Sequence, residues 1–175
     1  MDKDEMISAV PYRVVIITLS DKGSRGERQD KSGALIRQIV EAAGYRMESG
    51  VILPDEQELL ESELKRLCDE GLADLILTTG GTGFSPRDRT PEATLAVAER
   101  LVPGIAEAMR QQSLSITKRA MLSRAVSVIR KKTLIINLPG SPKAVKENLE
   151  HIITELRHGL DILTGRDGEC GKPAV

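Results

Sequence analysis

Aromatic residues are almost absent from this chain. Of its 175 residues two are tyrosine, one is phenylalanine and none is tryptophan. Proteins that hold single-stranded nucleic acid commonly stack its bases on aromatic side chains, so the chain lacks the surface for that mode of binding. The hydrophobic residues, 40% of the chain, must therefore build a core that is largely aliphatic.

Strong net charge, long apolar runs and paired cysteines are missing as well. The formal net charge of −1 gives no bulk attraction for nucleic acid or anionic membrane. No apolar run approaches the length of a membrane span, and the acidic start MDKDEMISAVPY is unlike a signal peptide. Cys68 and Cys170 form no Cys-x-x-Cys pair, which favours a reducing compartment. We expect a cytoplasmic protein that binds neither nucleic acid nor membrane.

What is present is an alternation of β-branched runs and amphipathic stretches. In the first half this pattern predicts strands at 13–20, 45–53 and 72–79, and helices at 30–44 and 54–71. Asp30 or Ser32 can cap the first of these helices. Connections of this length favour right-handed crossovers between parallel strands.

The second half predicts a helical stretch at 91–116 that breaks near Pro103, a β-hairpin at 125–140 and a closing helix at 141–165. We therefore predict an α/β fold of three layers, with a mostly parallel central sheet flanked by helices and a C-terminal hairpin contribution. A length of 175 residues fits a single domain. We expect its core at about 12–164, with flexible tails at 1–11 and 165–175.

The polar candidates follow the expected ends of the parallel strands. In an open parallel sheet, ligands bind beyond the carboxyl ends of the strands. The segments that leave those ends are 20–23, 54–56, 79–88 and 138–141. They bring carboxylates, two glycine-rich turns and several hydroxyls to one edge of the sheet.

The segment TTGGTGFSPRDRTPEAT at 78–94 places Gly80, Gly81 and Gly83 directly after a strand. Glycines let backbone N–H groups approach an anion, and a helix that follows adds positive potential. The segment is therefore a candidate phosphate cradle, with a ligand-free tight turn as the alternative. It matches neither a Walker A motif, which requires Gly-Lys-Ser/Thr, nor a Rossmann fingerprint, whose third glycine would stand at Pro86.

Asp55 and Asp88 are the strongest catalytic candidates. Mg²⁺ prefers a few carboxylates together with phosphate oxygens and water. Two aspartates beside a phosphate cradle suit Mg-dependent nucleotidyl transfer, in which the metal neutralises charge on the phosphorus and on the leaving pyrophosphate. Other roles stay open at this point. Asp55 can cap a helix, Asp88 can pair with Arg87 or Arg89, and Asp21 can close an Asx-turn.

Several motifs together resemble one family. The segment 78–94, with LSDKGSRGERQDKSG, ILPDEQ, PGIAEAMR, LSRAV and INLPGSPKAVKENLE, is similar to the bacterial molybdopterin adenylyltransferases, the MogA/MoaB family of molybdenum-cofactor biosynthesis. The resemblance covers about 12–163, with the motifs in order. It implies a homotrimeric domain of the molybdopterin-binding-like fold that uses Mg²⁺ and ATP to transfer AMP to molybdopterin. Pyrophosphate would be released, and the product would pass to a molybdate-insertion enzyme.

The resemblance also implies site residues. Asp55 and Asp88 correspond to essential carboxylates that hold or position Mg²⁺. Contacts to nucleotide or phosphate are implied for Thr79, Gly80, Gly81, Thr82, Gly83, Pro139, Gly140 and Ser141. Residues near the molybdopterin or the same pocket would be Ser20, Asp21, Asp30, Lys31 and Ser32. Arg89 is a departure, because many relatives have an aliphatic residue there.

Three other readings compete with this one. The chain could be a non-catalytic, pterin-binding trimeric scaffold of the same fold, a reading that the loss of either aspartate would favour. It could be the related domain of a molybdate-insertion enzyme, which needs further domains. It could also be an unrelated Mg-nucleotide hydrolase, for which the sequence reveals no base that would position water.

Overall fold

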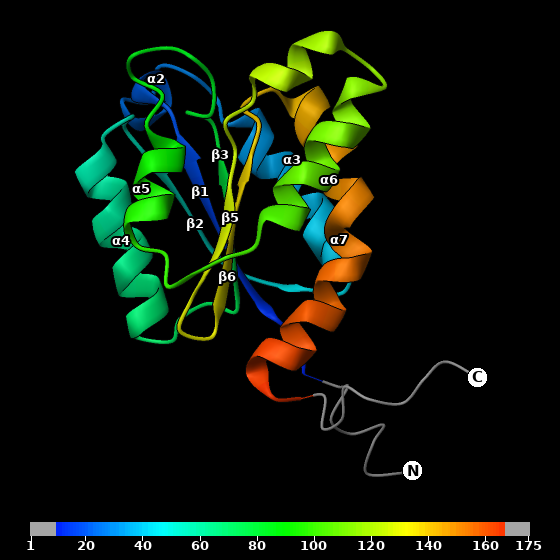
Figure 1. Cartoon of the computed structure of the whole chain (residues 1–175). Coiled ribbons are helices and arrows are strands. Elements are labelled where there is room, and N and C mark those ends of the chain that lie inside the picture. Colours follow the sequence, from blue (N-terminus) through cyan, green and yellow to red (C-terminus); the bar gives the residue numbers. More distant parts are fainter. Residues whose placement is uncertain (1–9, 167–175) are drawn as a thin grey trace.

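A six-stranded sheet with the strand order β2-β1-β3-β6-β5-β4 lies at the centre of the fold (Figure 1). The computed structural model describes residues 10–166. The parallel strands are β1 (Arg13–Leu19), β2 (Arg46–Leu53), β3 (Leu75–Thr79) and β6 (Thr133–Leu138). β5 (Ser127–Arg130) and β4 (Arg100–Leu101) are antiparallel. The mostly parallel sheet and the β5–β6 hairpin confirm the predicted α/β class.

Helices cover both faces of this sheet. α3 (Lys31–Ala42), α6 (Pro103–Leu114) and α7 (Pro142–Thr164) lie on one face, and α4 (Gln57–Asp69) and α5 (Thr90–Ala96) on the other (Figure 1). The central strands are apolar on both faces because both are buried. In β1, for example, Val14 and Ile16 join the core under α3 and α7, whereas Val15 and Ile17 join the core under α4 and α5.

The helix ends that face the strand edge carry side-chain caps, and the cap of α3 is one of the two that the sequence predicted. Asp30 is the N-cap of α3, and its Oδ1 accepts a hydrogen bond from the Gly33 amide at 2.8 Å. Ser32, the other candidate cap, donates instead to the carbonyl of Gly140 at 2.8 Å. Ser141 caps α7, with Pro142 in the first turn. These caps fix the positions of two segments that were predicted to lie near a ligand.

Two segments differ from the prediction. The stretch expected as one helix broken near Pro103 is two helices separated by β4, and α5 already ends at Ala96. The amides of Glu99 and Val102 bond to the carbonyls of Ile129 and Ser127, so pairing with β5 replaces helical bonding before the proline. The segment between the predicted strand at 13–20 and the predicted helix at 30–44 begins with a short helix that was not predicted, α2 (Asp21–Ser24), which Ser20 caps.

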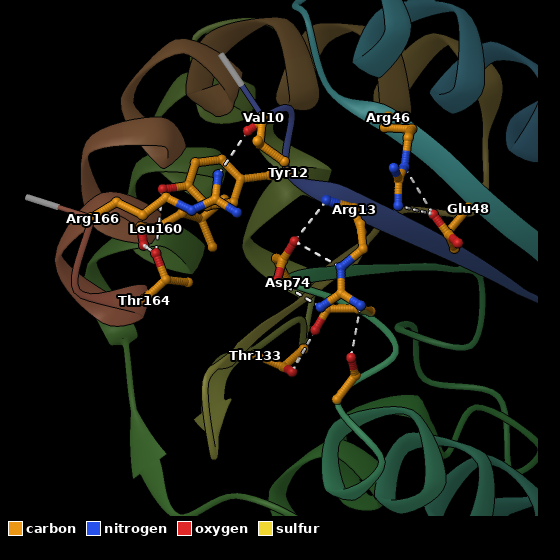
Figure 2. Close-up of polar contacts among 12 residues, drawn as sticks. Val10, Tyr12, Arg13, Arg46, Glu48, Asp74, Thr133, Leu160, Thr164 and Arg166 are labelled. Atoms are coloured by element: carbon orange, nitrogen blue, oxygen red, sulfur yellow. Dashed lines mark hydrogen bonds and ion pairs between the residues drawn. The ribbon is translucent and has the colours of Figure 1, made fainter. Parts of the chain in front are cut away.

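The end of the sheet opposite the predicted ligand edge is closed by polar contacts (Figure 2). The Arg166 guanidinium lies 4.2 Å from the centre of the Tyr12 ring, and its Nη1 donates to the carbonyl of Val10 at 2.7 Å. The Tyr12 hydroxyl donates to Asp161 on α7. Asp74 accepts bonds from the backbone and side chain of Arg13. These contacts join the two ends of the described chain.

Some predictions concern residues near or beyond these ends. Most of the expected tails, at 1–9 and 167–175, lies outside the described residues, as does Cys170. Cys68 is buried, and burial raises the pKa of its thiol to about 11. In the part that the structure describes, no helix combines the length and hydropathy that crossing a bilayer requires.

Candidate active site

More than half of the predicted residues line a pocket of about 690 Å³ at the carboxyl edge of the parallel strands. These eight residues are Ser20, Asp30, Lys31, Ser32, Thr79, Gly80, Gly140 and Ser141. They come from four segments that are distant in the sequence. Arg28 and Lys31 bring positive charge to this pocket, which suits a ligand that carries phosphate. Asp21, Asp55, Gly81 and Asp88 line neither this pocket nor the second one described below, and Asp55 lines a small hollow with Arg87 and Thr90 instead.

A second pocket of about 300 Å³ lies on the other side of the glycine loop. Thr82, Gly83 and Pro139 line it, together with residues of α6, α7 and the short helix η1 (Lys118–Leu122). The structure thus divides the predicted phosphate-binding residues between two neighbouring pockets. The glycine loop and the turn at 139–140 form the partition, and both pockets fall in the size range of small-molecule sites.

The glycine loop has a backbone that other residues would not adopt easily. Gly80 has a φ of 95° and Gly81 a φ of 67°. A Cβ atom on Gly80 would lie 2.5 Å from the Leu19 carbonyl oxygen, and one on Gly81 would lie 2.3 Å from Thr90 Oγ1. Both the dihedral angles and the close contacts therefore require glycine.

The carbonyls of this loop bond inward. Thr90 Oγ1 donates to Gly80 at 2.9 Å, and the Thr90 amide donates to Gly81 at 3.1 Å. The Arg124 amide and Nε donate to the carbonyls of Thr82 and Gly83 at 3.0 and 2.8 Å. No hydrogen bond among residues 10–166 uses the N–H groups of residues 81–83. These unused donors can meet an anion.

The turn at 139–141 is fastened to the same loop. Thr79 Oγ1 donates to the Pro139 carbonyl at 2.6 Å, and Gly140 packs so closely on Gly80 that its Cβ would lie 3.4 Å from the Gly80 Cα. The turn leads into α7, whose N-terminal end adds positive potential. Glycine loop, turn and helix end are thus held together in one packed unit at this edge of the sheet.

Asp55 faces Asp21 across the ends of β1 and β2. Each aspartate accepts a hydrogen bond from the other's amide at 3.0 Å. Asp55 is not the cap of α4, whose N-cap is Glu56. Burial raises the pKa of Asp55, and the charges of Asp21 and Asp88 raise it further, against the effect of the Asp21 amide bond. Asp55 is therefore a carboxylate whose surroundings disfavour its negative charge.

Asp88 is held by its own loop. Its Oδ2 accepts a hydrogen bond from the Ser85 amide at 3.0 Å. The ion pairs considered for it with neighbouring arginines do not form: Arg87 binds Asp21 and Glu56, and Arg89 binds the Gln57 side chain. The pKa of Asp21 is lowered, chiefly by the hydrogen bonds from Arg87, so this pairing replaces the Asx-turn considered for Asp21.

Each of the two candidate metal ligands, Asp55 and Asp88, keeps one carboxylate oxygen without a partner in the described chain. Within residues 10–166, no hydrogen bond or ion pair uses Asp55 Oδ1 or Asp88 Oδ1. The described chain contains no group of three or more His, Cys, Asp or Glu residues that could hold a metal. This donor set agrees with the preference of Mg²⁺ for one or two carboxylates plus phosphate and water.

Sequence reasoning gave no role to two residues that shape this edge. Arg124 also donates through Nη2 to the carbonyl of Asp88 at 2.6 Å and forms an ion pair with Glu92. It thus ties together both ends of the segment 82–92. The motif LSRAV contains Arg124, but its partners are more than 30 residues away, so its contacts were not readable from the sequence.

The other is Asn137, which is fully buried. Its amide nitrogen donates to Thr78 Oγ1 at 3.0 Å and to Thr94 Oγ1 at 2.9 Å, and its Oδ1 accepts from the Val126 amide at 3.2 Å. These bonds connect β6 with β3 and α5 directly below the glycine loop. An asparagine in the apolar run LIINL was the available signal.

Several known proteins are similar to this chain in sequence and in architecture. Residues 15–158 match the family described as probable molybdopterin binding domain. The molybdopterin adenylyltransferase of Haemophilus influenzae is 48% identical over 143 residues, covering 80% of this chain and 72% of that protein. The enzyme of the same name from Helicobacter pylori strain J99 is 40% identical over 155 residues, covering 86% of each.

A solved structure agrees with these sequences. The molybdopterin biosynthesis enzyme MoaB from Thermus thermophilus superposes with a TM-score of 0.83 at 47% identity, covering 88% of this chain and 97% of that one. The family match spans both pockets and all the candidate carboxylates. The chain therefore belongs to the family of probable molybdopterin binding domains.

Proposed function

We propose that this protein adenylylates molybdopterin in molybdenum-cofactor biosynthesis, as a nucleotidyltransferase. The observation that carries the proposal is the glycine loop with unused amides between two pockets, with the Asp88 carboxylate against Gly83 and Asp55 within electrostatic reach of Asp88. Two relatives are named molybdopterin adenylyltransferase, and their alignments cover more than two thirds of this chain and of each relative. The substrates would be ATP and molybdopterin.

In the proposed reaction a terminal phosphate oxygen of molybdopterin attacks the α-phosphorus of ATP. A new phosphorus–oxygen bond forms, and the bond from the α-phosphorus to the oxygen that bridges to the β-phosphate breaks. Pyrophosphate leaves with that electron pair. The two phosphate groups that react would meet at residues 80–83, each substrate occupying one of the pockets that the loop separates.

The chain's own groups supply most of what this transfer needs. The amides of 81–83 would hold phosphate oxygens, and Arg28 and Lys31 would balance phosphate charge in the larger pocket. We propose Asp55 and Asp88 as the residues that hold Mg²⁺. When bound, the ion would neutralise charge on the reacting phosphate and on the leaving pyrophosphate.

The alternative of a non-catalytic, pterin-binding scaffold predicts binding without turnover. Both carboxylates are present, and each keeps an oxygen free, which favours catalysis. A homotrimer, a cytoplasmic location and transfer of the product to a molybdate-insertion enzyme belong to the same proposal. Light scattering on the purified chain measures its assembly, and a monomer would remove the trimer from the proposal.

The test is to incubate purified protein with molybdopterin, ATP and Mg²⁺, and to measure adenylylated molybdopterin and pyrophosphate. Asp88→Asn should lower turnover by roughly 10²-fold or more, the size typical for loss of a transition-state charge contact. Asp69→Asn is the matched control, because within residues 10–166 the Asp69 side chain bonds to Arg130 alone and lines neither of the two pockets. Binding of molybdopterin without any product would support the scaffold instead.

A further inference from the structure

Arg87 occupies an unusual position among the carboxylates of the site. Its Nε and Nη2 donate to both oxygens of Asp21 at 3.1 and 2.8 Å, and Nη2 also donates to Glu56 at 3.0 Å. Asp21 is bonded to the Asp55 amide. The guanidinium therefore joins the loop that carries Asp88 to the two strand ends that carry Asp21 and Asp55.

The negative charges at this edge need a counter-ion. Asp21 and Asp55 accept hydrogen bonds from each other's backbone amides at 3.0 Å, and Glu56 follows Asp55 directly, so three carboxylates gather at these two strand ends. Without a cation, this group of carboxylates would repel the phosphates of an incoming nucleotide. In the structure, Arg87 supplies that positive charge.

We propose that Arg87 is the counter-ion of Asp21 and its neighbouring carboxylates in the free chain, and that a divalent cation bound at Asp55 and Asp88 replaces it in that role. This inference rests on the proposed function, which assigns those two aspartates to the cation. Arg87 would act as a positioning residue. It holds the loop and the strand ends together until the metal–nucleotide complex arrives.

The ion pair is built so that it can open. The Arg87 side chain is 51% exposed, and Glu56 is 52% exposed, so water and salt screen both contacts. Arg87 also precedes Asp88 directly in the chain, so the loop that must receive the metal is the one that the guanidinium holds.

Arg89 provides an internal comparison. It lies on the same loop and is also exposed, but its Nε and Nη2 donate to the neutral side-chain oxygen of Gln57, at 3.1 and 2.9 Å. Loss of Arg89 removes the same formal charge from the same loop without removing a carboxylate's partner. It therefore separates a specific counter-ion from a general change of surface charge.

The experiment measures Mn²⁺ binding to the full chain, without nucleotide, from the electron paramagnetic resonance signal of the free ion. Arg87→Gln should bind Mn²⁺ about three- to tenfold more tightly than wild type, the size expected when one screened unit charge near a divalent ion is lost. Arg89→Gln should change the affinity much less. Unchanged or weaker binding by Arg87→Gln, or equal tightening by Arg89→Gln, would overturn the inference.

Two further measurements separate this inference from the proposed function. Asp88→Asn should weaken Mn²⁺ binding; if it does not, the assumed metal site is wrong and the inference fails with it. If Asp88→Asn weakens binding but Arg87→Gln does not tighten it, only the inference fails. Circular dichroism verifies that each variant is folded, and Arg87→Ala repeats the measurement with a different side chain.

Discussion

At the residue scale, two aspartates of the sheet ends have opposite electrostatic surroundings. Asp55 is partly buried and faces two other carboxylates, which together raise its pKa. Asp74 is also buried, but the hydrogen bonds and charge of Arg13 outweigh burial and lower its pKa. Asp55 therefore has surroundings that would favour a bound cation, whereas Asp74 already pairs with Arg13.

The linkage between pKa and stability turns this contrast into a prediction. The folded chain binds the Asp55 proton more tightly than the unfolded chain does, because the pKa of Asp55 is raised on folding. Ionised Asp55 therefore lowers the free energy of unfolding at neutral pH. This loss of stability disappears as pH falls through the raised pKa. Asp55→Asn should therefore raise the melting temperature at pH 7, with a gap that narrows on acidification. Thermal unfolding from pH 7 to about pH 3 measures it.

Asp74→Asn is the control with the opposite sign. Its lowered pKa gives stability that is present above the unfolded value, 3.8 for a model aspartate, and is lost as pH falls through the folded value. This variant should melt below wild type at pH 7, and the difference should shrink only under more acidic conditions. A lower melting temperature for Asp55→Asn than for wild type at pH 7 would contradict the conclusion that the surroundings of Asp55 disfavour its negative charge.

Single residues of the site were predictable to the extent that their role is local. Gly80 and Gly81 could be predicted, because glycines directly after a strand indicate a special backbone. The partners of Arg87 could not be predicted from the sequence. Its bonds to Asp21 and Glu56 span 66 and 31 residues, and they depend on which strand ends lie side by side.

At the scale of elements, Arg124 joins the entry to the β5–β6 hairpin with the glycine loop and α5. It donates to the carbonyls of 82, 83 and 88 and pairs with Glu92, whose buried Oε2 has no hydrogen-bond partner within residues 10–166. The orientation of the segment that carries Asp88 is therefore set from a different part of the chain.

Replacement of Arg124 should separate this positioning role from general stability. Arg124→Met leaves loop carbonyls and Glu92 without their donor, and it should cost about 1–3 kcal/mol of stability together with a large loss of turnover. Arg130→Met is the matched control, because the Arg130 side chain also binds one carboxylate, Asp69, and donates to a backbone carbonyl, that of Val97, whereas the Arg124 side chain donates to two carbonyls. Urea unfolding and product formation are measured for both.

The two variants should differ in turnover rather than in folding. Both are expected to lose stability, but Arg130→Met should keep the rate of wild type. Equal effects on the rate would show that Arg124 acts only through the stability of the fold. Retained activity in Arg124→Met would show that the segment 82–92 keeps its orientation without the clamp.

Elements were more predictable than their order in the sheet. The periodicity of 30–44 and the apolar run at 13–20 correspond to α3 and β1 within a few residues. β4 was missed, because two exposed residues, Arg100 and Leu101, carry no strand signal and pair only because β5 lies alongside. The position of β3 between β1 and β6 is likewise a long-range outcome.

At the scale of the whole molecule, the candidate ligand-binding residues and the polar contacts that join the two chain ends lie at opposite ends of the sheet. α7 connects these ends: it begins at the Ser141 cap beside the larger pocket and ends near Arg166, roughly 35 Å away for its 23 residues. A mutation at the end of the sheet near Arg166 should therefore change the stability of the fold without changing the activity.

Tyr12→Phe tests this separation. The substitution removes the hydroxyl that bonds Asp161 and lies 3.4 Å from Thr164 Oγ1, while the ring under Arg166 remains. We expect a loss of about 1–2 kcal/mol in the free energy of unfolding and unchanged adenylylation. Chemical denaturation and the product assay measure the two quantities, and a selective loss of turnover would show that the two ends are coupled.

The most direct measurement of the central claim is a crystal structure of the protein with a non-hydrolysable ATP analogue and Mg²⁺. We expect phosphate oxygens within hydrogen-bonding distance of the amides of 81–83, and a metal ion that contacts Asp55 or Asp88. Nucleotide bound away from this loop, or phosphates with no metal near either aspartate, would contradict the claim.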